Sequence, residues 1–152
     1  MARINNPKKQ FNFEVYAAGL NSYAVQTVNI PGAEIEQVEH GDTNYSVKTP
    51  GRISYENITL EKLRPMDHAD NWIHDWINQV ADPILGSNGL PSEVKRNITI
   101  VQLAADNVTV TDQWEIEGAW PVRVNNMNLS RVSSDNAMET IELSVDRVVK
   151  VR

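Results

Sequence analysis

The clearest pattern in the chain is the alternation of apolar and polar residues between Val108 and Gly118. The apolar positions are Val108, Val110, Trp114 and Ile116, with Gly118 in the same phase. The opposite face carries Thr109, Thr111, Gln113, Glu115 and Glu117. A period of two is typical of a strand with one buried and one solvated side. Pro121 has no N–H for a sheet ladder, so the strand must stop, bulge or lie at an edge there.

A second alternating segment runs from Ala137 to Val148. Its apolar positions are Ile141, Leu143 and Val145, and the polar positions between and beside them are Thr140, Glu142, Ser144 and Asp146. This pattern predicts a closing strand with one buried face. A further strand is expected from Lys95 to Ala104, and the short connection before Val108 indicates that it forms a hairpin with the strand that follows.

Shorter strands are expected in the N-terminal part. Phe11, Phe13 and Val15 alternate with Asn12, Glu14 and Tyr16, after a polar N-terminal arm over residues 1–10. Gly19 to Ser22 predicts a turn, and Ala24 to Ile30 predicts the second strand. The Pro31-Gly32 pair breaks this strand, and Glu34 to His40 continues in extended conformation.

The segment from Gly41 to Gly51 is polar and contains several turn-type residues, so we expect a long exposed loop there. Beyond it, the alternation changes phase between Ile53 and Lys62. A phase change within one strand is what a β-bulge near Glu56-Asn57 would produce.

One helix is expected, at about residues 68–81. Apolar residues recur there at helical spacing and should pack on the sheet as its core face: Trp72, Ile73, Trp76 and Ile77, followed by Val80. Asp67 is a suitable N-cap, and Asp70 in the first turn suits the positive end of the helix dipole. Asp82-Pro83 should end the helix.

These elements together predict a single mainly β domain over residues 1–152. About seven strands and one helix favour an antiparallel β-sandwich or barrel. A chain of 152 residues is long enough to bury roughly 70% of its unfolded surface. The apolar fraction of 41% and charged fraction of 22% are ordinary for a globular domain, so composition does not change this picture.

Charge and cysteine usage narrow the classes of function. The net charge of −6 argues against a surface that binds nucleic acid phosphates, because such binding needs clustered Lys and Arg. Such a charge either keeps the protein soluble or forms a wall past which a polyanion slides. The absence of cysteine excludes disulfides, thiolate metal sites and cysteine nucleophiles. The N-terminus has no apolar core after its basic residues, so we expect no signal peptide, and no apolar run suggests a membrane span.

Candidate chemistry is weak throughout the chain. The histidines His40, His68 and His74 lie among polar residues without the ligand count of a metal site. Neighbouring carboxylates occur at Glu34 and Glu36, at Glu115 and Glu117, and at Glu142 and Asp146. They lie on solvated strand faces, which favours a polar wall over acid–base catalysis. Nucleophile-elbow and phosphate-loop patterns are absent. We therefore expect a protein that is not an enzyme and binds no cofactor.

Several motifs occur in an order that is typical of one protein family. The most specific are Gly-x-Trp-Pro at 118–121 and Glu-Thr-Ile-Glu-Leu-Ser-Val-Asp at 139–146. Weaker ones precede them: Phe13-x-Val15, Gly19, Pro31-Gly32 with Glu34-x-Glu36, Pro50-Gly51, Ile58-Thr59-Leu60 and Asp75-Trp76. Over roughly residues 11–148 the chain thus resembles the tail tube proteins of contractile-tailed bacteriophages and the related inner tubes of contractile injection systems. It departs from many relatives at Lys62 to Pro65, where their connection into the helix is shorter.

The resemblance implies a structural subunit of a phage tail. Relatives form hexameric rings that stack into a hollow tube inside a contractile sheath, and the genome passes through the lumen into the host. Four strands from each of six subunits give a barrel of roughly 24 strands, and at ~4.8 Å spacing and ~40° tilt its backbone diameter is roughly 50 Å. The implied partners are other copies of the chain, the sheath protein, the tape measure protein and DNA in the lumen, and baseplate and tail terminator proteins at the ends. No membrane partner is implied; the protein would be made in the host cytoplasm and reside in the virion.

The resemblance also suggests which residues serve the tube. The loop over residues 41–51 would reach between rings, with Asp42, Asn44, Tyr45 and Lys48 as contact candidates. Glu34, Glu36, Glu115 and Glu117 are candidates for lining the lumen, because their strands lie where the family builds its inner barrel and neither pair has a Lys or Arg adjacent in sequence. Two alternatives remain open at this point. One is the inner tube of an extracellular contractile injection or type VI-like secretion system, and the other is a carbohydrate-binding β-sandwich with Trp72 and Trp76 as a platform.

Overall fold

The computed structural model describes residues 10–18, 20, 25–41, 44–64, 72–86, 88–125 and 129–151. Its elements, in chain order, are β1 (Phe13–Tyr16), β2 (Val25–Asn29), β3 (Ala33–Gly41), β4 (Ser46–Tyr55), β5 (Ile58–Leu63), α1 (Trp72–Val80), α2 (Pro91–Val94), β6 (Arg96–Leu103), β7 (Val110–Val124), β8 (Met138–Ser144) and β9 (Arg147–Lys150). The predicted mainly β, antiparallel class is confirmed. The predicted number of elements was too low, since the described residues hold nine strands and two helices.

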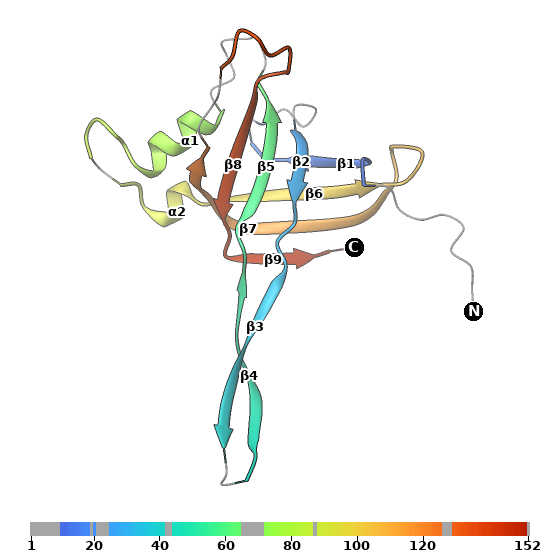
Figure 1. Ribbon diagram of the computed structural model, residues 1–152, viewed down its shortest axis with the longest axis vertical. Coiled ribbons are helices and arrows are strands. Elements are labelled where there is room, and N and C mark those ends of the chain that lie inside the picture. Colours follow the sequence, from blue (N-terminus) through green and yellow to red (C-terminus); the bar gives the residue numbers. More distant parts are fainter. Residues whose placement is uncertain are drawn as a thin grey trace.

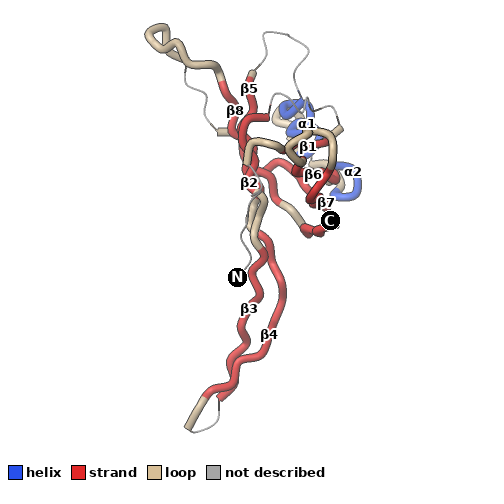
Figure 2. Tube along the Cα trace, turned by 90° about the vertical axis from the view of Figure 1, so that its right-hand side faces the viewer, coloured by secondary structure: helices blue, strands red, loops and turns tan. Residues whose placement is uncertain are grey.

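The body of the molecule has two layers that share one strand. Hydrogen-bonded neighbours follow the order β1-β6-β7-β8-β5-β2, and β9 also pairs with β7. Figure 1 shows β1, β6, β7 and β9 running across the view, whereas β8, β5 and β2 run steeply along it. Figure 2 shows the same two groups as separate layers from the side. β7 connects the layers, so the fold is a sandwich whose corner is turned by a single long strand.

The corner of β7 lies at residues 118–121. Gly118 has φ of 70°, and a Cβ there would lie 2.1 Å from the carboxylate of Asp146, so only glycine fits this position. The register with β6 shifts opposite this region, and the register with β8 shifts just after Pro121. The sequence required the strand to stop, bulge or lie at an edge at Pro121, and the structure shows a bulge. The shift also breaks the period of two, because Ile116 and Ala119 are both buried.

The closing segment is divided by the same corner. β8 pairs with β7 at Trp120–Val124, and β9 pairs with β7 at Trp114–Glu117. A chain that runs antiparallel to a bent strand must bend where the strand does, and it does so at Val145-Asp146. The prediction of one strand from Ala137 to Val148 was wrong for this reason, although the buried face of Ile141, Leu143 and Val145 is as expected.

The prediction of a loop from Gly41 to Gly51 was also wrong. β4 begins at Ser46 and pairs with β3 over the whole length of a long hairpin. Its polar composition mimics a loop because both faces of this two-stranded ribbon are solvated, so no apolar alternation is required. Nor is the segment from Ile53 to Lys62 one bulged strand: it is divided at Glu56-Asn57, where the chain leaves the hairpin as β4 and enters the sheet as β5.

The core lies between the layers and under α1. Trp72, Ile73 and Trp76 are buried there, and Ile77 is half-buried. The indole of Trp76 donates to the carbonyl of Val94 on α2 at 2.7 Å, and Arg96 lies 4.7 Å above its ring. α1 ends at Val80, just before Asp82-Pro83. The expected N-cap Asp67 and the first-turn Asp70 lie outside the described residues.

Candidate assembly surfaces

The β3–β4 hairpin projects from the body as an isolated ribbon. Figures 1 and 2 show it extending well beyond the two layers. All nine residues of β3 are exposed, and β3 and β4 form a two-stranded sheet of their own. Two-stranded ribbons are marginally stable in water without further packing. This ribbon is therefore a candidate surface for contacts with other chains.

Both faces of the ribbon carry apolar side chains. Ile35 lies directly opposite Ile53 on one face, and they are 55% and 53% exposed. On the other face, a Cβ at Gly51 would lie 3.1 Å from side-chain atoms of both Glu36 and Val38, so these two share that face. Val38 and Val47 are exposed as well. Apolar side chains on both sides of one ribbon mark it as a candidate for contact with other chains.

The residues proposed as contacts between rings do not all lie in the connection between β3 and β4. Asn44 and Tyr45 lie in the connection between the strands, and the Tyr45 side chain is 67% exposed. Lys48 lies on β4 opposite Glu39, so it is a member of a cross-strand pair rather than of a loop. Asp42 lies outside the described residues.

The four glutamates proposed for the lumen lie on two distinct parts of the fold. Glu34 and Glu36 are on the exposed ribbon, whereas Glu115 and Glu117 are half-buried on β7 in the body. The Arg147 guanidinium lies opposite Glu117 in the register of β7 and β9, and its Nε donates to Oε2 of Glu117 at 2.7 Å. Glu117 is thus paired with a cation that the sequence neighbourhood does not reveal. The argument from absent neighbouring cations was wrong for this residue.

The outward face of the layer formed by β2, β5 and β8, called the second layer below, carries acidic residues that were not among the lumen candidates. Glu61 and Glu142 alternate with the buried residues of β5 and β8. Asn57 donates to Oε1 of Glu142 at 2.9 Å, and Arg123 lies opposite Glu142 on β7. The period of two along both strands is the signal that could have placed Glu61 and Glu142 on one wall.

A buried group of charges joins β5, β8 and α1, and the sequence reasoning missed it. Lys62 and Glu139 are 2% and 8% exposed, and Nζ of Lys62 lies 3.7 Å from Oε2 of Glu139. Arg64 Nε at 3.3 Å and His74 Nε2 at 3.7 Å approach the other oxygen of Glu139. Lys62 follows Ile58 and Leu60 on the buried face of β5, so alternation alone predicts its burial. Its partner comes from a strand distant in sequence, and sequence patterns do not identify such a partner.

The turn between β6 and β7 is held by one carboxylate. Asp106 accepts hydrogen bonds from the backbone N–H groups of Thr109 and Val108, both at 3.0 Å, and from the Thr109 hydroxyl at 2.7 Å. These donors favour the charged form and lower the pKa of Asp106 from 3.8 to about 2, with the Thr109 backbone as the largest cause. The role is structural, because it fixes the predicted hairpin between these strands.

The described residues contain no group of three or more potential metal-ligating His, Cys, Asp or Glu side chains. His40 lies on the ribbon, His74 lies near Glu139, and His68 is outside the description. No helix among the described residues has both the length and the apolar character needed to cross a membrane. Trp72 and Trp76 are 8% and 0% exposed, so neither offers a ring face to a sugar.

Comparison with solved structures shows that the fold is shared with contractile injection machinery. One matching structure is described as the anti-feeding prophage tube-terminating cap, with a TM-score of 0.81 at 22% identity, covering 99% of this chain and 94% of the other. A sheath/tube terminator of an extracellular contractile injection system in the extended state matches with a TM-score of 0.80 at 23% identity, over 99% of this chain and 100% of the other. The sheath–tube complex of that system matches with a TM-score of 0.71 at 23% identity, over 97% and 93%.

Comparison of sequences identifies the family. The tail tube protein gp19 of Enterobacteria phage T4 is 27% identical over 140 residues, which cover 89% of this chain and 84% of that protein, and the phage T6 protein gives the same values. The model of the T4-like virus tail tube protein gp19 family matches residues 9–149. The chain therefore belongs to the T4-like virus tail tube protein gp19 family.

Proposed function

We propose that this protein is the structural subunit of a contractile phage tail, in which hexameric rings stack into a tube that conducts the genome. The observation that carries this proposal is the β3–β4 ribbon, with all of β3 exposed and apolar residues on both faces. A ribbon of this kind gains stability only when neighbouring copies cover it. Stacked rings place such copies above or below each subunit.

The open ends of the sheet support ring formation within one layer of the tube. β1 and β2 end the strand order of the body, and β9 pairs with β7 alone among the described strands. Unpaired edges promote uncontrolled association unless another chain or a closed arrangement covers them. Head-to-tail contacts around a closed ring satisfy the edges of every copy, whereas a contact between two identical patches would stop at a dimer.

A lumen with acidic walls would let DNA move without binding. The chain has a net charge of −6, and like charges on wall and phosphate backbone repel. We propose that Glu34, Glu36 and Glu115 contribute to this wall, with Glu61 and Glu142 on the outward face of the second layer as further members. Glu117 contributes less, because Arg147 is paired with it.

The implied partners follow from the position of a tube in a tail. The matching structures include a sheath–tube complex, a sheath/tube terminator and a baseplate, which supports contacts with sheath and baseplate proteins. We propose the tape measure protein and DNA as contents of the lumen, synthesis in the host cytoplasm, and residence in the virion tail. The protein would act as a building element without catalysis.

Electron microscopy of the purified protein in negative stain tests this function. We expect hollow rings or tubes of uniform diameter with six-fold symmetry in end views. Particles of the size of one chain at all protein concentrations, or filaments without a lumen, would contradict the proposal.

A second candidate is the inner tube of an extracellular contractile injection system, which would conduct protein instead of DNA. The fold likeness to such systems favours it as an alternative. Both functions require tubes, so microscopy does not separate them. Genes for a capsid and a packaging motor beside this gene support the phage tail, and toxin genes without a capsid support the injection system.

A further inference from the structure

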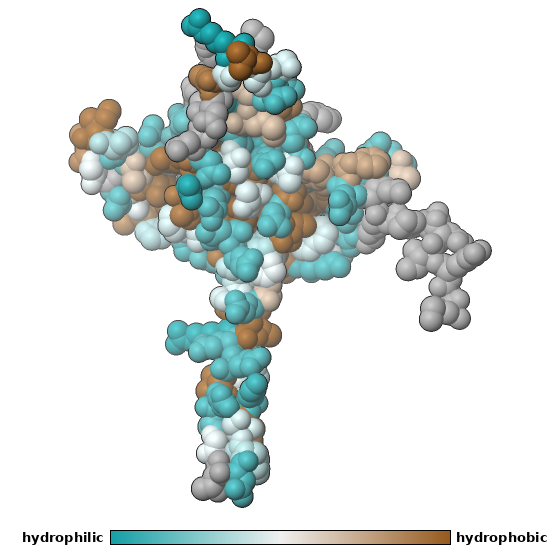
Figure 3. Space-filling view, in the orientation of Figure 1, coloured by the Kyte–Doolittle hydropathy of each residue, from teal (hydrophilic) through white to brown (hydrophobic). Residues whose placement is uncertain are grey.

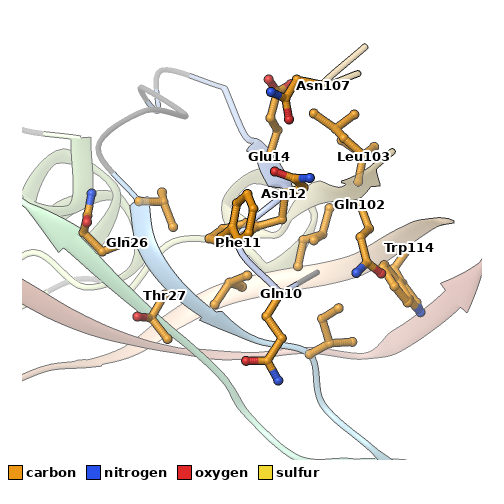
Figure 4. Close-up of a pocket in the computed structure, with 16 residues that line it drawn as sticks. Gln10, Phe11, Asn12, Glu14, Gln26, Thr27, Gln102, Leu103, Asn107 and Trp114 are labelled. Atoms are coloured by element: carbon orange, nitrogen blue, oxygen red, sulfur yellow. The ribbon is translucent and has the colours of Figure 1, made fainter. Parts of the chain in front are cut away.

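A groove with a largely apolar lining lies between β1 and β2, the two ends of the strand order of the body. Figure 4 shows its lining, with Gln26 and Thr27 on one side, Gln102 and Leu103 on the other, and Phe11 between them. Its volume is about 1010 Å³, and its apolar lining includes Phe11, Val25, Val28, Ile100, Leu103 and Trp114. A groove of this size along β1 and β2 has room for a short segment of protein.

An apolar tip lies at the other end of the body, in the connection between α1 and α2. We name Pro83, Ile84 and Leu85 the knob. The side chains of Ile84 and Leu85 are 91% and 78% exposed, and Figure 3 shows apolar surface at this extremity. Two adjacent large aliphatic side chains at such exposure are costly in water unless a partner covers them.

Hydrogen bonds within the chain support the backbone of the knob. The Asp82 carboxylate accepts from the backbone N–H groups of Ile84 at 2.9 Å and Leu85 at 3.2 Å, and the N–H of Gly86 donates to the Asp82 carbonyl at 2.8 Å. The N–H of Gly89 donates to Val80 at 2.9 Å, which fastens the connection back to α1. A preorganised contact loses less conformational entropy on binding.

We infer that the knob of one copy docks in the β1–β2 groove of the next copy around the ring, an inference that rests on the proposed function. Figure 1 shows the α1–α2 connection at one side of the body, with β1 reaching toward the other side and β2 nearer the middle. The knob and the groove are therefore separate surfaces, as a head-to-tail contact requires. The knob carries no charge, and among the described residues that line the groove Glu14 is the one that carries a charge. Two copies with a net charge of −6 each associate best through uncharged surface.

Engineered cysteines test the contact directly, because the natural chain contains none. Leu85→Cys places a thiol on the knob, and Thr27→Cys places one in the groove. After assembly and mild oxidation, an equimolar mixture of the two variants should give disulfide-linked dimers, and the double variant should give a ladder of linked chains. Each single variant alone should remain largely unlinked, because a head-to-tail contact never places two knobs together.

Val132→Cys provides the matched control for this experiment. Val132 is 97% exposed in the segment 129–137, outside the knob and the groove. Its mixture with Thr27→Cys should show at least tenfold less linkage than the knob mixture. Equal linkage in both mixtures, or linkage within either single variant, would overturn the inference.

Charge substitutions test whether the contact is needed for assembly. Ile84→Asp and Phe11→Lys, both at exposed positions, should melt within a degree or two of wild type. Each single variant should need at least a tenfold higher protein concentration to form tubes. The double variant should form tubes at a lower concentration than either single variant.

Normal tubes from Ile84→Asp would refute the knob contact while leaving the proposed function intact. Failure of the wild type to form tubes would instead refute the proposed function. If deletion of residues 1–9 abolishes tubes and Ile84→Asp does not, the groove binds that segment and the inference fails.

Discussion

The body and the β3–β4 ribbon contain similar residues, but they differ in how far their apolar side chains are buried. In the body, alternation of apolar and polar residues places side chains such as Ile58, Leu60 and Ile141 completely inside. In the ribbon, Ile35, Val38, Val47 and Ile53 are all about half exposed. The body is folded by its own core, whereas the ribbon has none and, in the proposed tube, would be covered by neighbouring copies. Substitutions in the body should therefore change stability, and substitutions in the ribbon should change assembly.

The largest stability change is expected in the body, at Trp76. Trp76 is fully buried and its indole donates to Val94. Trp76→Ala removes both the burial and the hydrogen bond, and should lower the free energy of unfolding by about 3–5 kcal/mol in urea titrations. Tyr45→Ala at the tip of the ribbon is the control, and should change it by less than about 0.5 kcal/mol. Equal effects at the two sites would remove the distinction between body and ribbon.

The corner of β7 gives the next largest effect. Gly118→Ala forces a side chain into a conformation with φ of 70° and against the Asp146 carboxylate. A cost of about 1–3 kcal/mol in the free energy of unfolding is expected from the backbone conformation. Gly32 lies near the base of the ribbon with nothing within 4 Å of an added Cβ, so Gly32→Ala should be close to neutral in the same thermal and urea measurements. A neutral Gly118→Ala would show that β7 does not need this corner.

Shortening the ribbon should separate folding from assembly. Gln37 lies opposite Pro50, so replacing residues 37–50 with a short Gly-Ser turn removes equal lengths of both strands. We expect an unchanged melting temperature and a loss of long tubes in micrographs, because the ribbon makes few contacts with its own body. Tubes of normal length from the shortened protein would mean that the ribbon does not join rings.

Charge reversal on the proposed wall should leave folding of the body unchanged and alter transport through the tubes that form. Glu34, Glu36 and Glu115 changed to Lys would make the lumen attract phosphates. We expect slower DNA ejection at low salt, with the difference shrinking at high salt as screening increases. Glu117→Lys is omitted because it would also break the pair with Arg147. Ejection rates that match wild type at low ionic strength, with intact tubes, would place these carboxylates outside the lumen.

The smallest effect is expected from the Asp106 turn in the body. Because the pKa of Asp106 is lowered to about 2 in the folded protein, its charged form adds stability that is present above pH 3.8. That contribution is lost as the pH falls from 3.8 through about 2. Asp106→Asn keeps an acceptor but has no titrating group. Its melting temperature should therefore fall less than that of wild type between pH 4 and 2. Parallel curves for the two proteins would show that the turn is not held by charge.

Sequence patterns predicted the body well where burial is one-sided. The strands β6 and β8, the start of β7 and the apolar face of α1 follow periods of 2 or 3.6, because each packs one face against a single core. The patterns were less informative for the ribbon, since a strand that is solvated on both faces has no required alternation. They also placed the carboxylates of Glu115 and Glu117 on one face, but they did not reveal that Arg147 would lie opposite Glu117.

The sequence by itself determined the mainly β class, the buried faces of the strands, the packed side of the helix and the family, because these depend on local periodicity and on the order of short motifs. Only the tertiary structure decided where β7 turns between the layers, which cations face Glu117 and Glu139, and where the apolar knob lies relative to the groove. Those features depend on which distant segments become neighbours. Pairing between segments is set by the packing of the whole chain, and residue spacing within one segment does not reveal which segments pair.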